Sequence, residues 1–299
     1  KISASQHFLS TFSISAFQLF SFSAFQLLPI MHISFSHIAW PPEEEAAALG
    51  FLKGLGLDTI EVAPMRAFGD PLAATESTVR EKADWYREQG FCIGSFQALL
   101  FGSDGLELFG NGESQDRMKE YLIAVGRVAG WAGAGPMVFG SPKNRLRGML
   151  TRSEAIGRAA ELFREVGDAC AEAGSCLVME ANPVAYGADF CNTLAEAVEL
   201  VTAVDSPGFG LHVDAGGMAL GADDFEAALR EAAHLVRHVH ASQSNLISFA
   251  EPNPIHPRIA KVLGEISYTG SIAIEMRAQP EGLDAVKQAV EAVSRIYHR

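Results

Sequence analysis

The sequence has few cysteines, and their spacing excludes two common scaffolds. Only four of its 299 residues are cysteine, and none of them forms a CxxC pair or a zinc-finger pattern. A chain of this length can bury a large core without disulfide bonds, so nothing in it requires a disulfide framework. We therefore expect a protein of the reducing cytoplasm.

Positive charge is also scarce. The chain has 23 Lys and Arg residues against 36 Asp and Glu residues, a formal net charge of −13. A charge of this sign repels the phosphate backbone of nucleic acids and the surface of anionic membranes. We expect a small molecule as the partner, with no role for nucleic acid or membrane, and the composition leaves a homo-oligomer open.

Charged side chains are nearly absent from residues 1–30, where Lys1 is the only one. Ser and Gln interrupt the apolar residues there, so the segment lacks the roughly 20 mostly apolar residues of a membrane span and the clean apolar block of a secretory signal. We interpret residues 1–30 as an extension outside the catalytic unit, which is residues 31–299. The alternative is an apolar arm that docks on a neighbouring subunit.

From Met31 onward, short runs of β-prone residues alternate with longer segments of helical periodicity. This alternation is typical of βα units and of a parallel sheet. Each run is apolar throughout, which favours a closed (β/α)8 TIM barrel, whereas an open doubly wound sheet would require a glycine-rich loop after the first strand. We expect eight strands, at residues 32–39, 59–63, 91–97, 136–140, 176–180, 210–214, 236–241 and 271–275.

Four consecutive strands end with a side chain that can bind a metal ion. They are Glu180, Asp214, His240 and Glu275, and each follows the one before by about one βα unit. In a barrel the carboxyl ends of the strands share one rim, so we expect the four side chains to face one point. Three carboxylates and one imidazole suit Mn²⁺, Mg²⁺ or Co²⁺ better than a thiolate site would, and Zn²⁺ remains an alternative.

The segments around these residues carry a family resemblance. They are Met179-Glu180-Ala181-Asn182-Pro183, His212-Val213-Asp214, His240-Ala241-Ser242 and Ala273-Ile274-Glu275-Met276-Arg277. From about His32 to its end, the chain resembles the xylose isomerase-like TIM-barrel superfamily and, within it, the sugar phosphate isomerase/epimerase group. The resemblance implies one divalent ion, Mn²⁺ first, bound by Glu180, Asp214, His240 and Glu275. It also implies that the two glutamates remove and return a proton on opposite faces of the substrate.

The chain departs from the pattern of tagatose/psicose 3-epimerase-like enzymes at three positions. Those enzymes carry a histidine three residues after the metal-binding aspartate, an acidic residue six after the first glutamate and an arginine six after the metal-binding histidine. Here Gly217, Tyr186 and Leu246 occupy these places. Since the metal ligands are kept and this substrate shell is not, we expect a substrate other than a free ketohexose.

Further polar residues lie at strand ends or in the loops beyond them, where they could contact a substrate. The loop after the fourth strand, residues 139–147, carries three positive charges that could hold a phosphate or carboxylate. His212 lies two residues before Asp214 and should share its side of the strand, one layer deeper. The candidate substrate-binding residues are His37, Gln97, Lys143, Asn182, His212, His256 and Arg277.

The favoured function is a metal-dependent isomerase or epimerase that acts on a sugar, sugar acid or sugar-phosphate-like compound by proton transfer through an enediolate. A divalent ion stabilises the enediolate, and Glu180 and Glu275 act as the acid/base pair. A dehydratase or lyase, including one that cleaves a C-glycoside or 3-keto-sugar, is the first alternative, because the same enediolate can expel a β-substituent. DNA repair of the AP endonuclease kind and a metal-free binding role are the remaining ones.

Overall fold

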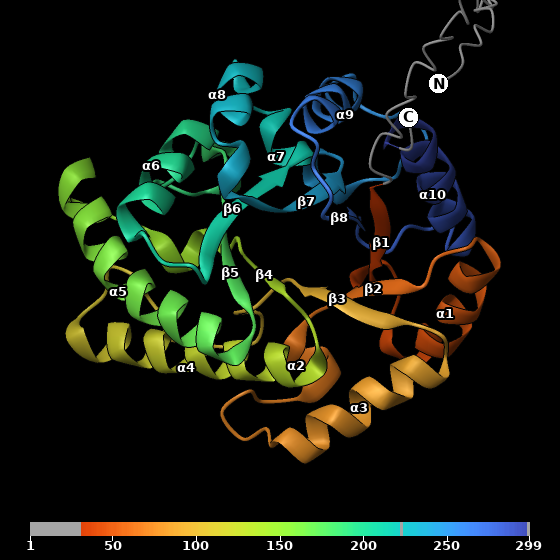
Figure 1. Cartoon of the computed structure of the whole chain (residues 1–299), viewed down its shortest axis with the longest axis horizontal. Helices are drawn as coiled ribbons and strands as arrows, with labels where there is room; N and C mark the ends of the chain where they lie inside the picture. Colours follow the sequence, from red (N-terminus) through yellow and green to blue (C-terminus); the bar gives the residue numbers. More distant parts are fainter. Residues whose placement is uncertain (1–30, 222–223, 298–299) are drawn as a thin grey trace, which may run out of the picture.

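The computed structural model describes residues 31–221 and 224–297, so the interpretation of residues 1–30 lies outside the described residues. Its strands pair in parallel and in chain order into a closed barrel (Figure 1). The predicted (β/α)8 barrel is therefore confirmed. The strands are β1 His32–Ser36, β2 Thr59–Val62, β3 Cys92–Phe96, β4 Pro136–Phe139, β5 Cys176–Glu180, β6 Phe209–Asp214, β7 Val236–Ser242 and β8 Ser271–Glu275.

All eight predicted strands are present, and β5 and β8 have the predicted bounds. The largest difference is at β1, which ends at Ser36, whereas the prediction extended it to Ala39. Residues His37–Ala39 instead form a 3₁₀ turn, in which the ring of His37 accepts a hydrogen bond of 2.7 Å from the backbone N–H of Ala63. This contact, with the residue that follows β2, joins positions 26 residues apart, so the local sequence of β1 does not predict it.

Helices cover the outside of the barrel (Figure 1). The α-helices are α1 Glu45–Gly54, α2 Pro64–Phe68, α3 Glu76–Glu88, α4 Gly112–Ala132, α5 Arg152–Ala173, α6 Leu194–Val204, α7 Ala215–Met218, α8 Phe225–Glu231, α9 Ile255–Glu265 and α10 Leu283–Tyr297. The 3₁₀ helices are η1 His37–Ala39, η2 Pro42–Glu44, η3 Pro142–Arg145, η4 Val184–Tyr186, η5 Ala233–Leu235 and η6 Ser244–Leu246. Within the described ranges, none of these helices has the length and apolar character needed to cross a membrane.

The start of α5 follows from local chemistry. Thr151 and Glu154 form a capping box, in which the Thr151 hydroxyl accepts from the Glu154 backbone N–H and the Glu154 carboxylate accepts from the Thr151 N–H at 2.9 Å. Such a pair satisfies two of the N–H groups that a helix leaves free at its first turn. The loop from β4 into α5 therefore ends at a defined residue.

Strand register brings the predicted ligands to one end of the barrel. Asp214 on β6 pairs with His240 on β7, and Glu275 on β8 pairs with Ser242, which is two residues beyond His240. Because side chains alternate along a strand, residues two apart share a face. His240 and Ser242 therefore point to the same side as each other, toward the neighbours that carry Asp214 and Glu275.

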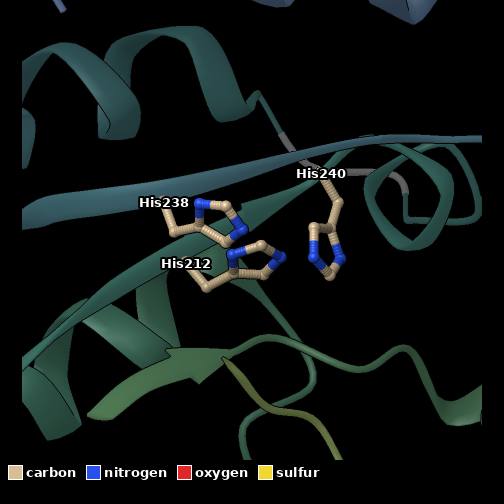
Figure 2. Close-up of side chains that lie close together, drawn as sticks. All are labelled: His212, His238 and His240. Carbon is tan, nitrogen blue, oxygen red and sulfur yellow. The ribbon is translucent and has the colours of Figure 1, made fainter. Parts of the chain in front are cut away.

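The inside of the barrel is unusually polar next to this end. His212, His238 and His240 are all buried, and their ring centroids lie 4.2 to 5.3 Å apart (Figure 2). Glu61 on β2 is also buried, with 0% of its surface exposed. Buried polar groups are costly unless they are paired, so this layer requires a specific set of partners.

Candidate active site

The predicted ligands line one cavity of about 440 Å³ at the carboxyl end of the barrel strands. Glu180, Asp214, His240 and Glu275 are all part of its wall. They come from β5, β6, β7 and β8, which are neighbours in the barrel. The structure therefore brings together the four side chains that the sequence places at successive strand ends.

Three of the four offer ligand atoms to a common point. Atoms of Asp214, His240 and Glu275 all lie within 4.8 Å of one another. The Nδ1 atom of His240 is 3.1 Å from Oε2 of Glu275, yet it makes no hydrogen bond with any described residue. Ligands about 2.1 Å from an ion and at right angles to each other are about 3 Å apart. The spacing and the free nitrogen both fit a shared divalent ion.

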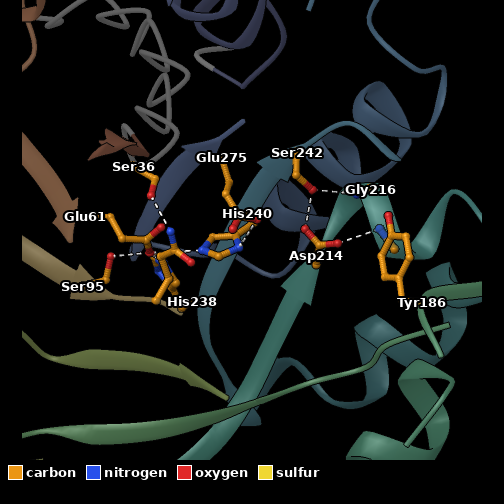
Figure 3. Close-up of polar contacts among 12 residues, drawn as sticks. Ser36, Glu61, Ser95, Tyr186, Asp214, Gly216, His238, His240, Ser242 and Glu275 are labelled. Carbon is orange, nitrogen blue, oxygen red and sulfur yellow. Dashed lines mark hydrogen bonds and ion pairs between the residues drawn. The ribbon is translucent and has the colours of Figure 1, made fainter. Parts of the chain in front are cut away.

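Asp214 is held in place by its neighbours. One carboxylate oxygen accepts the backbone N–H of Gly217 at 2.6 Å, and the other accepts the hydroxyl of Ser242 (Figure 3). A Cβ atom at Gly217 would lie 2.9 Å from Asp214 Oδ2 and 3.3 Å from Pro183. Glycine at this position lets the backbone approach the aspartate closely.

Glu180 completes the acidic wall and has a perturbed acidity. Burial, and then the nearby carboxylates of Asp214 and Glu275, raise the pKa of Glu180 from its ordinary value of 4.5 to about 8. Burial and the Glu275 carboxylate raise the pKa of Asp214 as well. Like charges held together away from water favour the neutral acids. A divalent cation would remove this repulsion, which is why the donor set fits one.

Nearby carboxylates favour the protonated form of His240 when no ion is bound. Burial alone would lower its pKa, but the carboxylates of Glu61 and Glu275 outweigh burial and raise the pKa well above the ordinary value. By contrast, burial and the charges of His240 and His238 hold the pKa of His212 well below its usual range. His212 is therefore neutral beneath the site.

We expect Glu180→Gln to change how the ion-free protein responds to pH. The pKa of Glu180 is raised on folding, so its contribution to stability is fully present below its unfolded value and is lost as pH rises through about 8. Glutamine is neutral throughout. With a chelator present, the free energy of unfolding of the variant, taken relative to that of the wild type, should therefore be higher at about pH 9 than at about pH 5. Denaturant titrations at both pH values would measure it; a constant difference would contradict it.

Gly140 at the end of β4 makes room for Glu180. A Cβ atom at this position would overlap Oε2 of Glu180 and would lie 3.6 Å from the amide nitrogen of Asn182. Gly140→Ala should therefore displace the Glu180 carboxylate while leaving the barrel folded. Misplacement of a reacting group by about 1 Å can cost up to about 100-fold in rate. Kinetics on any substrate that the wild type turns over would test this, with Gly157→Ala on α5, where a Cβ meets nothing within 4 Å, as the control.

Three of the predicted substrate contacts also line the cavity. Gln97 follows β3 and is anchored by a hydrogen bond of 3.1 Å from its amide to the hydroxyl of Ser36. Asn182 has a buried amide nitrogen with no partner among the described residues, so it offers a free donor. Arg277 is the only lining residue with a permanent positive charge in the described part of the chain.

The other four predicted contacts do not line the cavity. His37 is buried, and its two ring nitrogens are occupied by the Ala63 N–H and the Glu45 carboxylate. His256 lies in the helical layer on α9, where its ring is 2.9 Å from the hydroxyl of Tyr297. Lys143 is exposed on η3, and His212 lies one layer below His240.

The basic loop also differs from the expectation that it would present three charges. Arg145 is fully buried, and its guanidinium donates to the backbone oxygen of Glu180 at 2.7 Å. Arg147 donates to the backbone oxygens of Asp189 and Leu150. Backbone oxygens thus accept hydrogen bonds from two of the three cations, although Nε and Nη2 of Arg145 have no partner among the described residues. These hydrogen bonds tie the loop to the backbone around it.

Three other cavity residues were not among the predicted contacts, although two of them, Tyr186 and Leu246, occupy substrate-shell positions of the 3-epimerase pattern. Tyr186, Asn245 and Leu246 line the wall, and the Tyr186 hydroxyl accepts the Asn245 backbone N–H at 3.0 Å. They lie in the loops after β5 and β7, where no periodicity indicates which way a side chain points. Glu61, which lies below the cavity, could have been noticed in the sequence, because it is the one charged residue in the strand Thr59–Val62.

Comparisons with known proteins agree with this architecture. A family model described as xylose isomerase-like TIM barrel matches residues 49–296. The fold is similar to D-psicose 3-epimerase from Clostridium cellulolyticum H10, with a TM-score of 0.74 and 16% identity over 90% of this chain and 100% of that one. It is also similar to 3-keto-D-glucoside 4-epimerase from E. coli, with a TM-score of 0.72 and 17% identity over 89% of this chain and 98% of that one. An AP endonuclease, family 2, from Brucella melitensis has a TM-score of 0.66 and 15% identity over 91% of this chain and 100% of that one. No curated protein matches the chain in sequence. At such low identity, the likeness to solved structures shows the fold alone.

Proposed function

Because this chain belongs to the xylose isomerase-like TIM barrel family, we propose that it is a divalent-metal-dependent isomerase or epimerase of a sugar, sugar acid or sugar-phosphate-like compound. The observation that carries the proposal is the convergence of Glu180, Asp214, His240 and Glu275 on one cavity. Solved epimerases of similar fold, for D-psicose and for a 3-keto-D-glucoside, support the reaction class. We assign the catalytic unit to residues 31–299.

Glu180 and Glu275 are the proposed acid/base pair. They come from β5 and β8, so they approach the cavity from different strands and can flank a substrate between them. A carboxylate placed within hydrogen-bond reach of the reacting carbon can take up or return its proton, and both glutamates line the cavity. One glutamate would take the proton next to the carbonyl, and the other would return one on the opposite face.

The residues that would hold the ion are Glu180, Asp214, His240 and Glu275. Oxygen-rich sets of this kind suit Mn²⁺, which we propose as the ion, ahead of Mg²⁺, Co²⁺ or Zn²⁺. A bound ion would stabilise the negative charge that develops on the carbonyl and hydroxyl oxygens as the proton leaves. The hydrogen bonds from Gly217 and Ser242 keep the Asp214 carboxylate in place for this task.

Substrate hydroxyl groups would meet Asn182, Gln97 and Arg277. The free amide donor of Asn182 and the guanidinium of Arg277 are in the cavity wall, and both can donate to oxygen. At the positions where the 3-epimerase pattern has polar or charged groups, this cavity has Tyr186 and Leu246. A more apolar wall favours a substituted sugar over a free ketohexose.

Solvent exchange tests the proposed reaction. The protein should be incubated with Mn²⁺ in D₂O with three groups of compounds: free ketohexoses, 3-keto-glycosides and ketose phosphates. We expect deuterium to enter one of the last two groups next to the carbonyl, at unchanged composition otherwise, as seen by NMR and mass spectrometry. Free ketohexoses should be slower by about tenfold or more, since one lost substrate contact costs about 1–3 kcal/mol.

Other products would favour the alternatives. Loss of water or of a glycosyl group, without a deuterated isomer, would make the protein a lyase. Incision of abasic DNA would make it a repair enzyme, which the formal charge of −13 argues against. Absence of any exchange in all three groups of compounds would contradict the proposal.

A further inference from the structure

Glu61 on β2 is a charged residue that the proposed reaction does not use. It is fully buried, and one oxygen, Oε2, accepts three hydrogen bonds (Figure 3). The donors are the hydroxyl of Ser95 at 2.7 Å, Nε2 of His238 at 2.8 Å and Nε2 of His240 at 3.1 Å. A buried carboxylate is costly, so three donors aimed at one oxygen indicate a defined task.

The hydrogen bonds have only one consistent direction. An ionised carboxylate can only accept, so His238 and His240 must both carry a proton on Nε2. The Nδ1 atom of His238 then accepts from the hydroxyl of Ser271, 3.4 Å away. Ser271, His238 and Glu61 thus form a chain that ends on His240.

His240 has its two nitrogens on opposite sides of this arrangement. Nε2 faces Glu61, and Nδ1 faces Glu275 in the proposed metal centre. Only a nitrogen without a proton can bind a cation, and a proton kept on Nε2 leaves the lone pair of Nδ1 free. The ring of His212 also packs edge-on against His240, at 4.2 Å between centroids, and limits its rotation (Figure 2).

We propose that Glu61 is a positioning residue for the metal centre: it fixes the tautomer and the orientation of His240 so that Nδ1 faces the ion. This inference rests on the proposed function for the existence of the ion, but not for the reaction. Ser95 and His238 hold Glu61 in turn. Removal of such an outer partner typically weakens metal affinity by about 10-fold to 100-fold.

Metal affinity of the full chain tests the assignment without any substrate. We expect Glu61→Gln to weaken Mn²⁺ binding by about 10-fold to 100-fold in competition with a chelator. The matched control is Glu45→Gln, because Glu45 is a partly buried carboxylate that also accepts from a histidine, His37 at 3.2 Å, outside the cavity. The control should keep wild-type affinity. Equal affinities of Glu61→Gln and wild type, or equal losses in both variants, would overturn the proposal.

A second measurement needs no variant and covers a failure of Glu61→Gln to fold. In wild-type protein loaded with Zn²⁺ and labelled with ¹⁵N-histidine, NMR should show His240 protonated at Nε2 and metal-bound at Nδ1. The opposite pattern would overturn the proposal, and so would about two equivalents of Zn²⁺ with His212 and His238 as ligands. If the ion binds as expected but no compound exchanges deuterium, the proposed reaction fails and the role of Glu61 stands.

Discussion

Glu275→Gln should lower proton exchange with solvent by about 10³-fold while the barrel still folds, and Glu180→Gln should do the same. Both side chains line the cavity, on β8 and β5, and glutamine has nearly the same size but cannot take up a proton. General acid–base groups contribute about 10²-fold to 10⁴-fold, and the paired mechanism needs both. Deuterium incorporation followed by NMR would measure each variant.

The two glutamates are also proposed ligands, so the assay has to separate the roles. Exchange should be measured at saturating Mn²⁺, where a variant that only binds the ion more weakly regains activity. Glu291→Gln, on the exposed side of α10 at 3.9 Å from Lys287, is the matched surface control and should behave as wild type. Near-wild-type exchange by either variant at saturating ion would show that the two-glutamate mechanism is wrong.

Removal of the divalent ion should abolish exchange, by about 10³-fold or more, and Mn²⁺ should restore it. Three acidic side chains share the cavity with His240, and the raised pKa values of Glu180 and Asp214 show how poorly the site tolerates its own charge. The barrel itself has a large apolar core between strands and helices, so it should stay folded in chelator. The far-UV circular dichroism should be unchanged.

Stability gives an independent readout of the same ion. At a concentration about 100 times its Kd, a ligand that binds only the folded state adds about 2.7 kcal/mol of stability. The unfolding midpoint should therefore rise with Mn²⁺, and the rise should be smaller in Asp214→Asn, which loses one ligand charge. Full exchange activity in chelator, with less than one equivalent of metal on the protein, would exclude a metal-dependent reaction.

The fold and the four converging side chains followed from patterns along the chain. A strand in a closed barrel is buried on both sides, so its composition alone marks it. A residue at the carboxyl end of such a strand faces the common rim, whichever loops follow. Glu180, Asp214, His240 and Glu275 therefore came together in the structure as their sequence positions predicted.

Side chains outside the strands followed no such rule. His37 was a reasonable contact by position, but Glu45 and the backbone of Ala63 occupy its ring. Arg145 lies in a loop over the active face, yet its guanidinium is buried against the backbone oxygen of Glu180. In both cases a backbone group more than 20 positions away in the chain forms a hydrogen bond with the side chain, and such long-range partners cannot be read from local sequence.

The sequence by itself determined the barrel, its strand order and the acidic ring at its rim, because these depend on periodicity and on one shared direction of the strands. Only the tertiary structure decided which polar residues reach the cavity and which lie beneath it. Glu61 shows the difference. Its place in β2 marked it as an odd charge, but only the closure of the barrel put it beneath His240 from β7, since that contact joins residues far apart in the chain.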